Sequence, residues 1–150
     1  MRYPVIASHA LHVALSTTII MAGIGTVANA MSAYTWKKRP LVVIAPADDN
    51  AELARQRGII ASARAGFAER DMVIVYVVGD TVSVELGGLP SQSASALRAR
   101  FGVGKGAFRV LLVGKDGGVK LSRAAPLGSG ALFGEIDAMP MRIDEMRRRK

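Results

Sequence analysis

The sequence has no cysteine, and its two histidines, His9 and His12, both lie within the first thirty residues. Without cysteine there is no disulfide bond, no thiol nucleophile and no CxxC redox pair. A bacterial lipoprotein anchor is excluded too, because it requires a cysteine at the cleavage site. If the first thirty residues leave as a leader, the rest of the chain also lacks histidine, which excludes a Ser-His-Asp triad and zinc sites built on His or Cys. We therefore expect no cofactor and no metal centre of that kind.

Acidic residues are absent from residues 1–30, where Arg2 precedes a long apolar run that ends in Ala28-Asn29-Ala30. A basic start, an apolar middle and an A-x-A end are the three parts of a secretory signal peptide. We predict a signal peptide over residues 1–30 that is cleaved after Ala30, and hence a periplasmic or secreted protein. The competing interpretation is an uncleaved anchor, because the run approaches the roughly 20 residues that span a bilayer. Polar residues within the run and basic residues after it are unfavourable for an anchor.

Residues 31–150 contain 19 basic and 12 acidic residues, a formal net charge of +7, and are of a length that suits one domain. The most basic stretch is the end of the chain, Arg147 to Lys150. These cations could bind an anionic surface, or they could only complement a helix dipole and maintain solubility. A secreted protein rarely meets nucleic acid, so we expect no nucleic-acid partner and no stable membrane anchor after cleavage. The partner that we expect is another envelope or extracellular protein, an envelope polymer or a small anionic ligand.

Two apolar runs of strand length, residues 39–46 and 71–80, flank a segment with helical periodicity at residues 48–71. Runs that are apolar on both faces are typical of strands in a covered sheet. A strand, a helix and a strand in succession predict a right-handed crossover between parallel strands. We expect the helix to begin with a capping box of Asp49 and Glu52. Its buried stripe would consist of Leu53, Gln56, Ile60, Ala63 and Phe67.

The segment "FRVLLVGKDGGVKLSR", residues 108–123, predicts a β-hairpin with its turn at Asp116-Gly117-Gly118. Its Gly-Lys pair does not belong to a phosphate-binding loop, because Arg109 stands where the first glycine is required and Asp116 follows Lys115. We interpret Lys115 and Asp116 as an exposed pair in the turn. A short helix is expected before the hairpin, at residues 91–103, with Ser91 or Ser93 as its cap.

The last helical segment, residues 131–149, contains Pro140. This proline either kinks one helix or occupies the first turn of a second helix that Asp137 caps.

Three separated motifs carry a resemblance to a known family. They are "W-x-x-RPL" at Trp36, Arg39, Pro40 and Leu41, "FRVLLVGKDGGVKL", and "IDAMPMRIDEM". Together they resemble the DUF4174 family, a domain of unknown function in bacterial secreted proteins and some animal extracellular-matrix proteins, and the resemblance covers residues 33–147. It implies a thioredoxin-like, peroxiredoxin-related domain over residues 31–150: a three-layer α/β/α fold whose mixed sheet has a central parallel βαβ unit and a C-terminal antiparallel hairpin. Redox-active relatives carry their cysteine just after the first strand, where this chain has "APADDNAEL".

The candidate site residues fall into two groups. Asp48, Asp49 and Glu52 stand where the fold usually has its active site, and could bind a hard cation, supply a general base or simply cap a helix. Gln56, Arg39 and Trp36 are candidate ligand-binding residues. Gln56 is either a rim residue that bonds a backbone group or part of a pocket.

Three arginines, Arg39, Arg109 and Arg142, either pair with Asp137 or Glu145 in a structural network or converge on an anionic ligand. Trp36 is expected to cover the core together with Tyr34, or else to dock on a partner.

Two functional hypotheses follow. In the first, the chain is a cysteine-free thioredoxin-like domain that acts as a non-catalytic binding module through an exposed patch. In the second, it is a hydrolase or cation-dependent enzyme that uses the acidic start of its first helix, which would then lie in a concave pocket.

Overall fold

The computed structural model describes residues 31–88 and 93–150. The predicted signal peptide, its cleavage site, the alternative anchor and the candidate cap Ser91 lie outside these residues. Within the described part of the chain, no helix is both long and apolar enough to cross a membrane.

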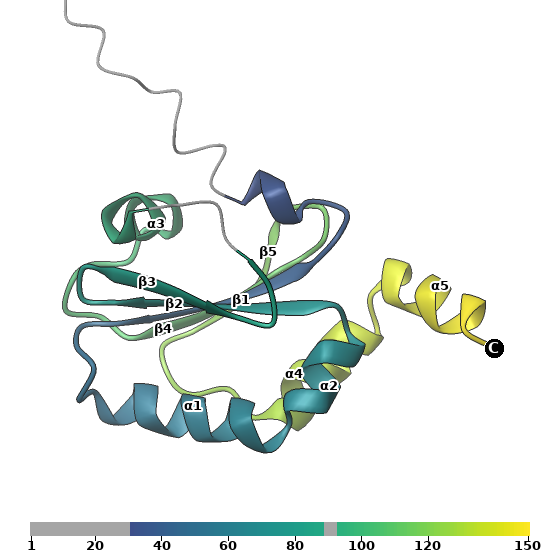
Figure 1. Cartoon of the computed structure of the whole chain (residues 1–150), viewed down its shortest axis with the longest axis horizontal. Helices are drawn as coiled ribbons and strands as arrows, with labels where there is room; N and C mark the ends of the chain where they lie inside the picture. The colour runs from purple at the N-terminus through teal and green to yellow at the C-terminus, as the bar shows by residue number, and fades with distance from the viewer. Residues whose placement is uncertain (1–30, 89–92) are drawn as a thin grey trace, which may run out of the picture.

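A five-stranded mixed sheet forms the centre of the molecule (Figure 1). Its strands are β1 (Arg39–Ala45), β2 (Met72–Val78), β3 (Thr81–Glu85), β4 (Arg109–Val113) and β5 (Val119–Arg123), in the order β3-β2-β1-β4-β5. β1 and β2 are parallel, and every other neighbouring pair is antiparallel. The predicted parallel crossover and the C-terminal hairpin are therefore confirmed. Every residue of β1 and β2 is buried, as two-sided apolar runs indicated.

Helices cover both faces of this sheet. The helical elements are η1 (Ser32–Tyr34), α1 (Ala51–Ser62), α2 (Arg64–Glu69), α3 (Ala94–Phe101), α4 (Ser129–Asp137) and α5 (Pro140–Arg148). In Figure 1, α1, α2 and α4 lie on one side of the sheet, η1 and α3 lie on the other, and α5 extends beyond the sheet.

Alternate strand residues enter two separate hydrophobic clusters, because successive side chains of a strand point to opposite faces. Leu41 and Val43 pack in one cluster with residues of α1, α2 and α4, including Phe67. Val42 and Ile44 pack in the other cluster with residues of η1 and α3. The sheet is thus covered by a core on each side.

The helix expected over residues 48–71 is wrong in two respects. It is divided at Ala63, whose φ of −121° and ψ of 19° are not helical, into α1 and α2. Its N-cap is Asn50, whose side chain accepts a hydrogen bond from the backbone N–H of Leu53 at 2.9 Å, so the capping box of Asp49 and Glu52 does not form. The buried stripe continues through the break, as Leu53, Gln56, Ile60 and Phe67 are all buried.

Pro140 begins a second helix, which was one of the two expectations for the C-terminal segment. It occupies the first turn of α5, where a missing N–H costs no helical hydrogen bond. Asp137 does not cap this helix, because the N-cap is Met139 and no side chain bonds there. The Asp137 carboxylate is instead bound by Arg70 and Arg142.

Candidate functional site

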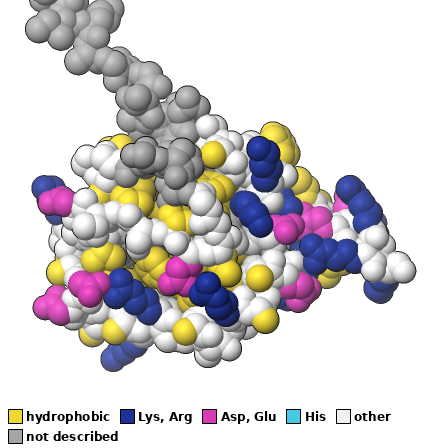
Figure 2. Space-filling view, viewed as in Figure 1, with side chains coloured by type: hydrophobic (Ala, Val, Ile, Leu, Met, Phe, Trp, Pro, Cys, Tyr) yellow, Lys and Arg dark blue, Asp and Glu magenta, His cyan; other side chains and the backbone are white. Residues whose placement is uncertain are grey.

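Charged side chains concentrate at the end of the sheet where β1 and β2 begin and α5 packs. We call this group the ion-pair cluster: Arg39, Arg70, Lys115 and Arg142 with the carboxylates of Glu69, Asp71, Asp137 and Glu145. On the face seen in Figure 2, basic and acidic side chains lie next to one another beside α5. The cluster joins residues that are far apart in sequence, including Arg39 at the start of β1 and Glu145 on α5.

Glu145 is the centre of one half of this cluster. Its two carboxylate oxygens accept hydrogen bonds from Arg39 at 3.0 and 3.1 Å, and the Lys115 ammonium donates a third at 2.7 Å. Arg39 is only 1% exposed and Lys115 8% exposed, so both cations depend on this carboxylate. Burial raises the pKa of Glu145, but the hydrogen bonds and charges of Arg39 and Lys115 outweigh it and bring the pKa down to about 2.

Asp137 and Arg142 form the other half. Arg142 is 1% exposed and donates to Asp137 at 3.2 Å and to Glu69 at 2.7 Å. Arg70 donates two further hydrogen bonds to Asp137, at 3.0 and 2.6 Å. Burial opposes ionisation of Asp137, yet these hydrogen bonds hold its pKa below the usual value. Asp137 and Glu145 are thus ionised and engaged, which suits a structural network rather than proton transfer.

The structural interpretation of the arginines is confirmed for Arg39 and Arg142, which pair with Glu145 and Asp137. Arg109 is not part of the cluster, because it begins β4 opposite Ile44, near the other end of β1, and its Nε is buried without a hydrogen-bond partner. The interpretation of Lys115 as an exposed turn residue is wrong. Its ammonium binds Asp71 at 2.9 Å as well as Glu145, while Asp116 pairs with Lys120.

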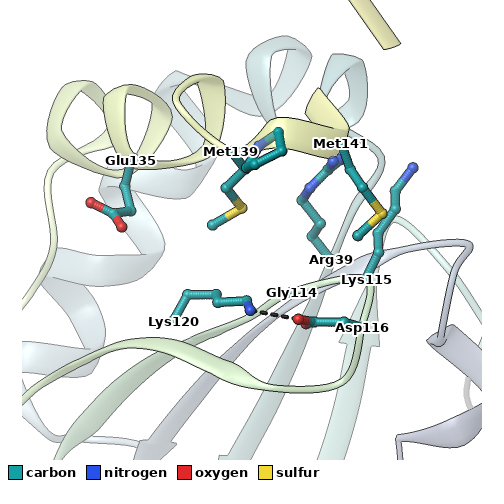
Figure 3. A pocket seen from close by; sticks show the side chains of 9 residues that line it. Arg39, Gly114, Lys115, Asp116, Lys120, Glu135, Met139 and Met141 are labelled. Carbon is teal, nitrogen blue, oxygen red and sulfur yellow. Dashed lines mark hydrogen bonds and ion pairs between the residues drawn. The ribbon is translucent and has the colours of Figure 1, made fainter. Parts of the chain in front are cut away.

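A pocket of about 400 Å³ lies beside the ion-pair cluster (Figure 3). The β4–β5 hairpin contributes its floor with Gly114, Lys115, Asp116 and Lys120, and the α4–α5 junction contributes Glu135, Met139, Pro140 and Met141. Arg39 lies at the boundary between the pocket and the cluster. A volume of this size is in the range of small-molecule sites.

The acidic candidates lie elsewhere, at the start of α1. Asp48 pairs with Arg57 at 2.8 Å, and its side chain is 80% exposed. Asp49 is exposed, and Glu52 stands in the first turn of the helix. In the ranges 31–88 and 93–150, no three His, Cys, Asp or Glu side chains form a group that could hold a metal ion. The carboxylate-dependent enzyme stays a prediction to which this geometry adds no support.

Gln56 bonds a backbone group, as one of its two interpretations predicted, but it is fully buried and is therefore not a rim residue. Its fully buried amide donates to the Leu127 carbonyl at 3.3 Å and accepts from the Leu127 N–H at 2.7 Å. It therefore fastens the segment before α4 to α1 and is not available to a ligand.

Trp36 does not cover the core, whereas its neighbour Tyr34 does. Tyr34 is 5% exposed, whereas Trp36 is 68% exposed and has a backbone φ of 65°. The Trp36 N–H donates to the Lys115 carbonyl at 2.6 Å, which ties this conformation to the hairpin. Docking on a partner is the expectation for Trp36 that agrees with this geometry.

Sequence reasoning missed the burial of Lys115, its pairing with Glu145 and the pocket. A signal existed for Lys115, since it directly follows the buried strand residues 110–113 and Gly114. No sequence spacing could indicate its partners, because Asp71 and Glu145 are 44 and 30 residues away. The pocket likewise depends on the packing of two distant segments.

Comparison with known proteins gives a family and two relatives whose names state no activity. Residues 30–145 match the family model described as "Domain of unknown function (DUF4174)". The chain is 27% identical over 135 residues to "Coiled-coil domain-containing protein 80" of Danio rerio, in an alignment that covers 79% of this chain and 16% of that protein. It is 29% identical over 131 residues to "Sushi repeat-containing protein SRPX" of Homo sapiens, and this alignment covers 85% of this chain and 28% of that protein. The chain thus spans less than a third of either relative. No solved structure matches.

Proposed function

The chain belongs to the DUF4174 family, a domain of unknown function, and we propose that it is a cysteine-free, thioredoxin-like binding module that acts outside the cytoplasm. Its partner in this proposal is another protein of the envelope or the extracellular space. The surface that we assign to docking consists of Trp36, Lys37 and Lys38.

The thioredoxin-like description is supported by the topology. A parallel β1–α1–β2 unit is extended on the β1 side by an antiparallel strand, β4, and its hairpin partner, β5. Export is supported by the basic start, apolar run and Ala28-Asn29-Ala30 end of residues 1–30. It predicts that protein recovered from the envelope or medium begins at Met31, which N-terminal sequencing would test.

One observation carries the docking surface: the only tryptophan of the chain is exposed and is held in a strained backbone conformation. A non-glycine residue in the left-handed region costs about 1–2 kcal/mol. Folding offsets this cost through the hydrogen bond to Lys115, yet the indole itself gains little burial. Aromatic residues exposed in this way are enriched in the centres of protein interfaces.

The charges beside Trp36 favour an acidic partner. Within the described residues, Lys37 and Lys38 make no ion pair, in contrast to Arg39 directly after them. Opposite charge on the partner would accelerate association and would make it dependent on salt.

Photo-crosslinking in the native cell tests the docking surface. Trp36 is replaced by a photoreactive phenylalanine derivative, and the same residue is placed at Ala61, an exposed position of α1, as the matched control. We expect an adduct of defined mass from position 36 that is absent from position 61 and that weakens when Lys37 and Lys38 become glutamate. Equal labelling at both positions, or none at position 36, would contradict the proposal.

A further inference from the structure

We propose that the pocket between the α4–α5 junction and the β4–β5 hairpin binds a cationic group on an aliphatic stem, such as an alkylammonium or a lysine side chain. This site shares no side chain with the Trp36 docking surface, so either proposal can fail while the other holds.

The walls of the pocket are apolar where the helices form them. Met139, Pro140 and Met141 face the hairpin, and in Figure 3 the thioether ends of the two methionines point toward it. Met141 is 37% exposed, although it is apolar. Methionine side chains are unbranched and polarisable, so they adapt to the shape of a flexible stem.

The positive charges at the pocket are already engaged. Arg39 and Lys115 are bound by Glu145 and Asp71 at 2.7 to 3.0 Å, and the Lys120 ammonium binds Asp116 at 2.6 Å. An anionic ligand that recruited Arg39 or Lys115 would leave the ionised Glu145 with fewer partners, and unpairing a buried charge is strongly unfavourable.

The negative charge at the pocket is not fully engaged. Within residues 31–88 and 93–150, Glu135 makes no ion pair and no hydrogen bond through its side chain, while it lines the pocket from α4. In Figure 3 the Glu135 carboxylate lies at the edge of the pocket, above the Lys120 side chain, whose ammonium points away from it toward Asp116. Glu135 is exposed, so a cation in the pocket would displace solvent from its carboxylate but would break no ion pair.

Lys120 shows how a cationic chain fits this floor. Its side chain crosses Gly114 to reach Asp116, and a Cβ on Gly114 would lie 2.6 Å from both Lys120 Cε and Asp116 Oδ1. Lys120 and Asp116 have side chains that are 36% and 39% exposed, so solvent weakens this pair. The pair can open, and a second cation can then reach Asp116 as well as Glu135.

The start of α5 favours the opposite charge, since no side chain caps it and helix N-termini attract anions. The two carboxylates facing the cavity oppose this effect. Probes that share one stem and differ only in their head group measure which is stronger, the attraction of the helix N-terminus for an anion or that of the carboxylates for a cation.

The test follows the methyl signals of selectively labelled methionines in the full chain during titration with hexylammonium, hexanol and hexanoate. We expect hexylammonium to cause saturable shifts at Met139 and Met141, with the buried Met72 as the internal control. The affinities of hexanol and hexanoate should be at least about fivefold lower than that of hexylammonium. Preferential binding of hexanoate, or no saturable shift with hexylammonium, would overturn the assignment.

Two variants should move the affinity in opposite directions. Glu135→Gln should weaken hexylammonium binding about fivefold or more, because it removes the free carboxylate, whereas Glu52→Gln, the same change on α1, should have no effect. Lys120→Gln should strengthen binding several-fold, because Asp116 then lacks its internal cation. Weaker binding in Lys120→Gln, or unchanged binding in Glu135→Gln, would refute the cation assignment.

A last comparison identifies the source of the cation. A blocked tripeptide, Ala-Lys-Ala, that binds more tightly than hexylammonium would indicate a lysine of a partner polypeptide. Tighter binding of hexylammonium would indicate a free amine.

Discussion

At the scale of single residues, the buried charges are organised by a few carboxylates. Glu145 accepts hydrogen bonds from two cationic side chains that have almost no access to water, and Asp137 accepts hydrogen bonds from two more. A buried ion pair contributes little net stability compared with an apolar replacement, but removing one partner leaves an uncompensated charge. Glu145 should therefore be among the most sensitive positions of the chain.

Replacing Glu145 with glutamine is expected to destabilise the protein by about 3 kcal/mol, because Arg39 and Lys115 lose their shared carboxylate. Urea denaturation at neutral pH measures the change. Asp144→Asn is the matched control on the same helix. Its partner is Arg147, and both side chains are more than half exposed, so we expect a change within about 0.5 kcal/mol. A small effect of Glu145→Gln would show that the cluster is not the main attachment of α5.

The same residue predicts how stability depends on pH. The pKa of Glu145 is about 2 in the folded protein, below its ordinary value of 4.5. Its contribution is therefore fully present above pH 4.5 and is lost as the pH falls toward 2, with a total of about 3 kcal/mol. As the pH is lowered from 4.5 to 2, the free energy of unfolding should fall more steeply for the wild type than for Glu145→Gln. Denaturation curves recorded at several pH values measure this dependence. Parallel curves would assign the acid sensitivity to other groups.

At the scale of secondary structure, helix periodicity was easier to predict than helix ends. The stripe of Leu53, Ile60 and Phe67 follows from the spacing of apolar residues and is buried as expected. The N-cap of α1 and the break at Ala63 depend on backbone angles, and neighbouring residues could adopt the same angles. Asp49, Asn50 and Ser62 all have side chains that suit helix ends, and only the observed geometry selects Asn50.

Substitution of two adjacent residues separates these two capping schemes. Asn50→Ala should lower the free energy of unfolding by about 1 kcal/mol, because the Leu53 N–H loses its acceptor. Asp49→Ala should change it by less than about 0.5 kcal/mol. Thermal denaturation of both variants provides the measurement. A larger loss of stability in Asp49→Ala than in Asn50→Ala would support the capping box instead.

At the scale of the whole molecule, the described domain includes residues that precede the first strand. Met31 and Tyr34 are 3% and 5% exposed and pack against the α3 face of the sheet. The Tyr34 hydroxyl also donates to the Gly88 carbonyl at 3.0 Å. A domain that begins at Met31 retains these contacts.

Two truncations test this boundary. A chain that begins at Met31 should unfold with the stability of the described domain, whereas a chain that begins at Thr35 should lose about 3 kcal/mol, because burial of a large apolar side chain contributes about 1.5–3 kcal/mol. Urea denaturation of both chains measures the difference. Equal stability of the two chains would show that the packing of η1 does not stabilise the domain.

The amino-acid sequence was sufficient to predict four of the five strands, the parallel crossover, the hairpin and the absence of thiols. Apolar runs, turn glycines and missing residue types are local or compositional properties, so no knowledge of packing is needed to interpret them. It also indicated the family, which the match of residues 30–145 to the family model confirms.

Which charges meet depends on how distant segments pack in the folded chain. Arg39 and Glu145 are separated by 106 residues, and Arg142 and Glu69 by 73. Twenty basic and twelve acidic residues allow many pairings, and the sheet order and the placement of α5 select among them. The same packing exposes Trp36, pairs Gln56 with the Leu127 backbone and opens the pocket beside Glu135, because each depends on segments that contact one another only in the folded chain.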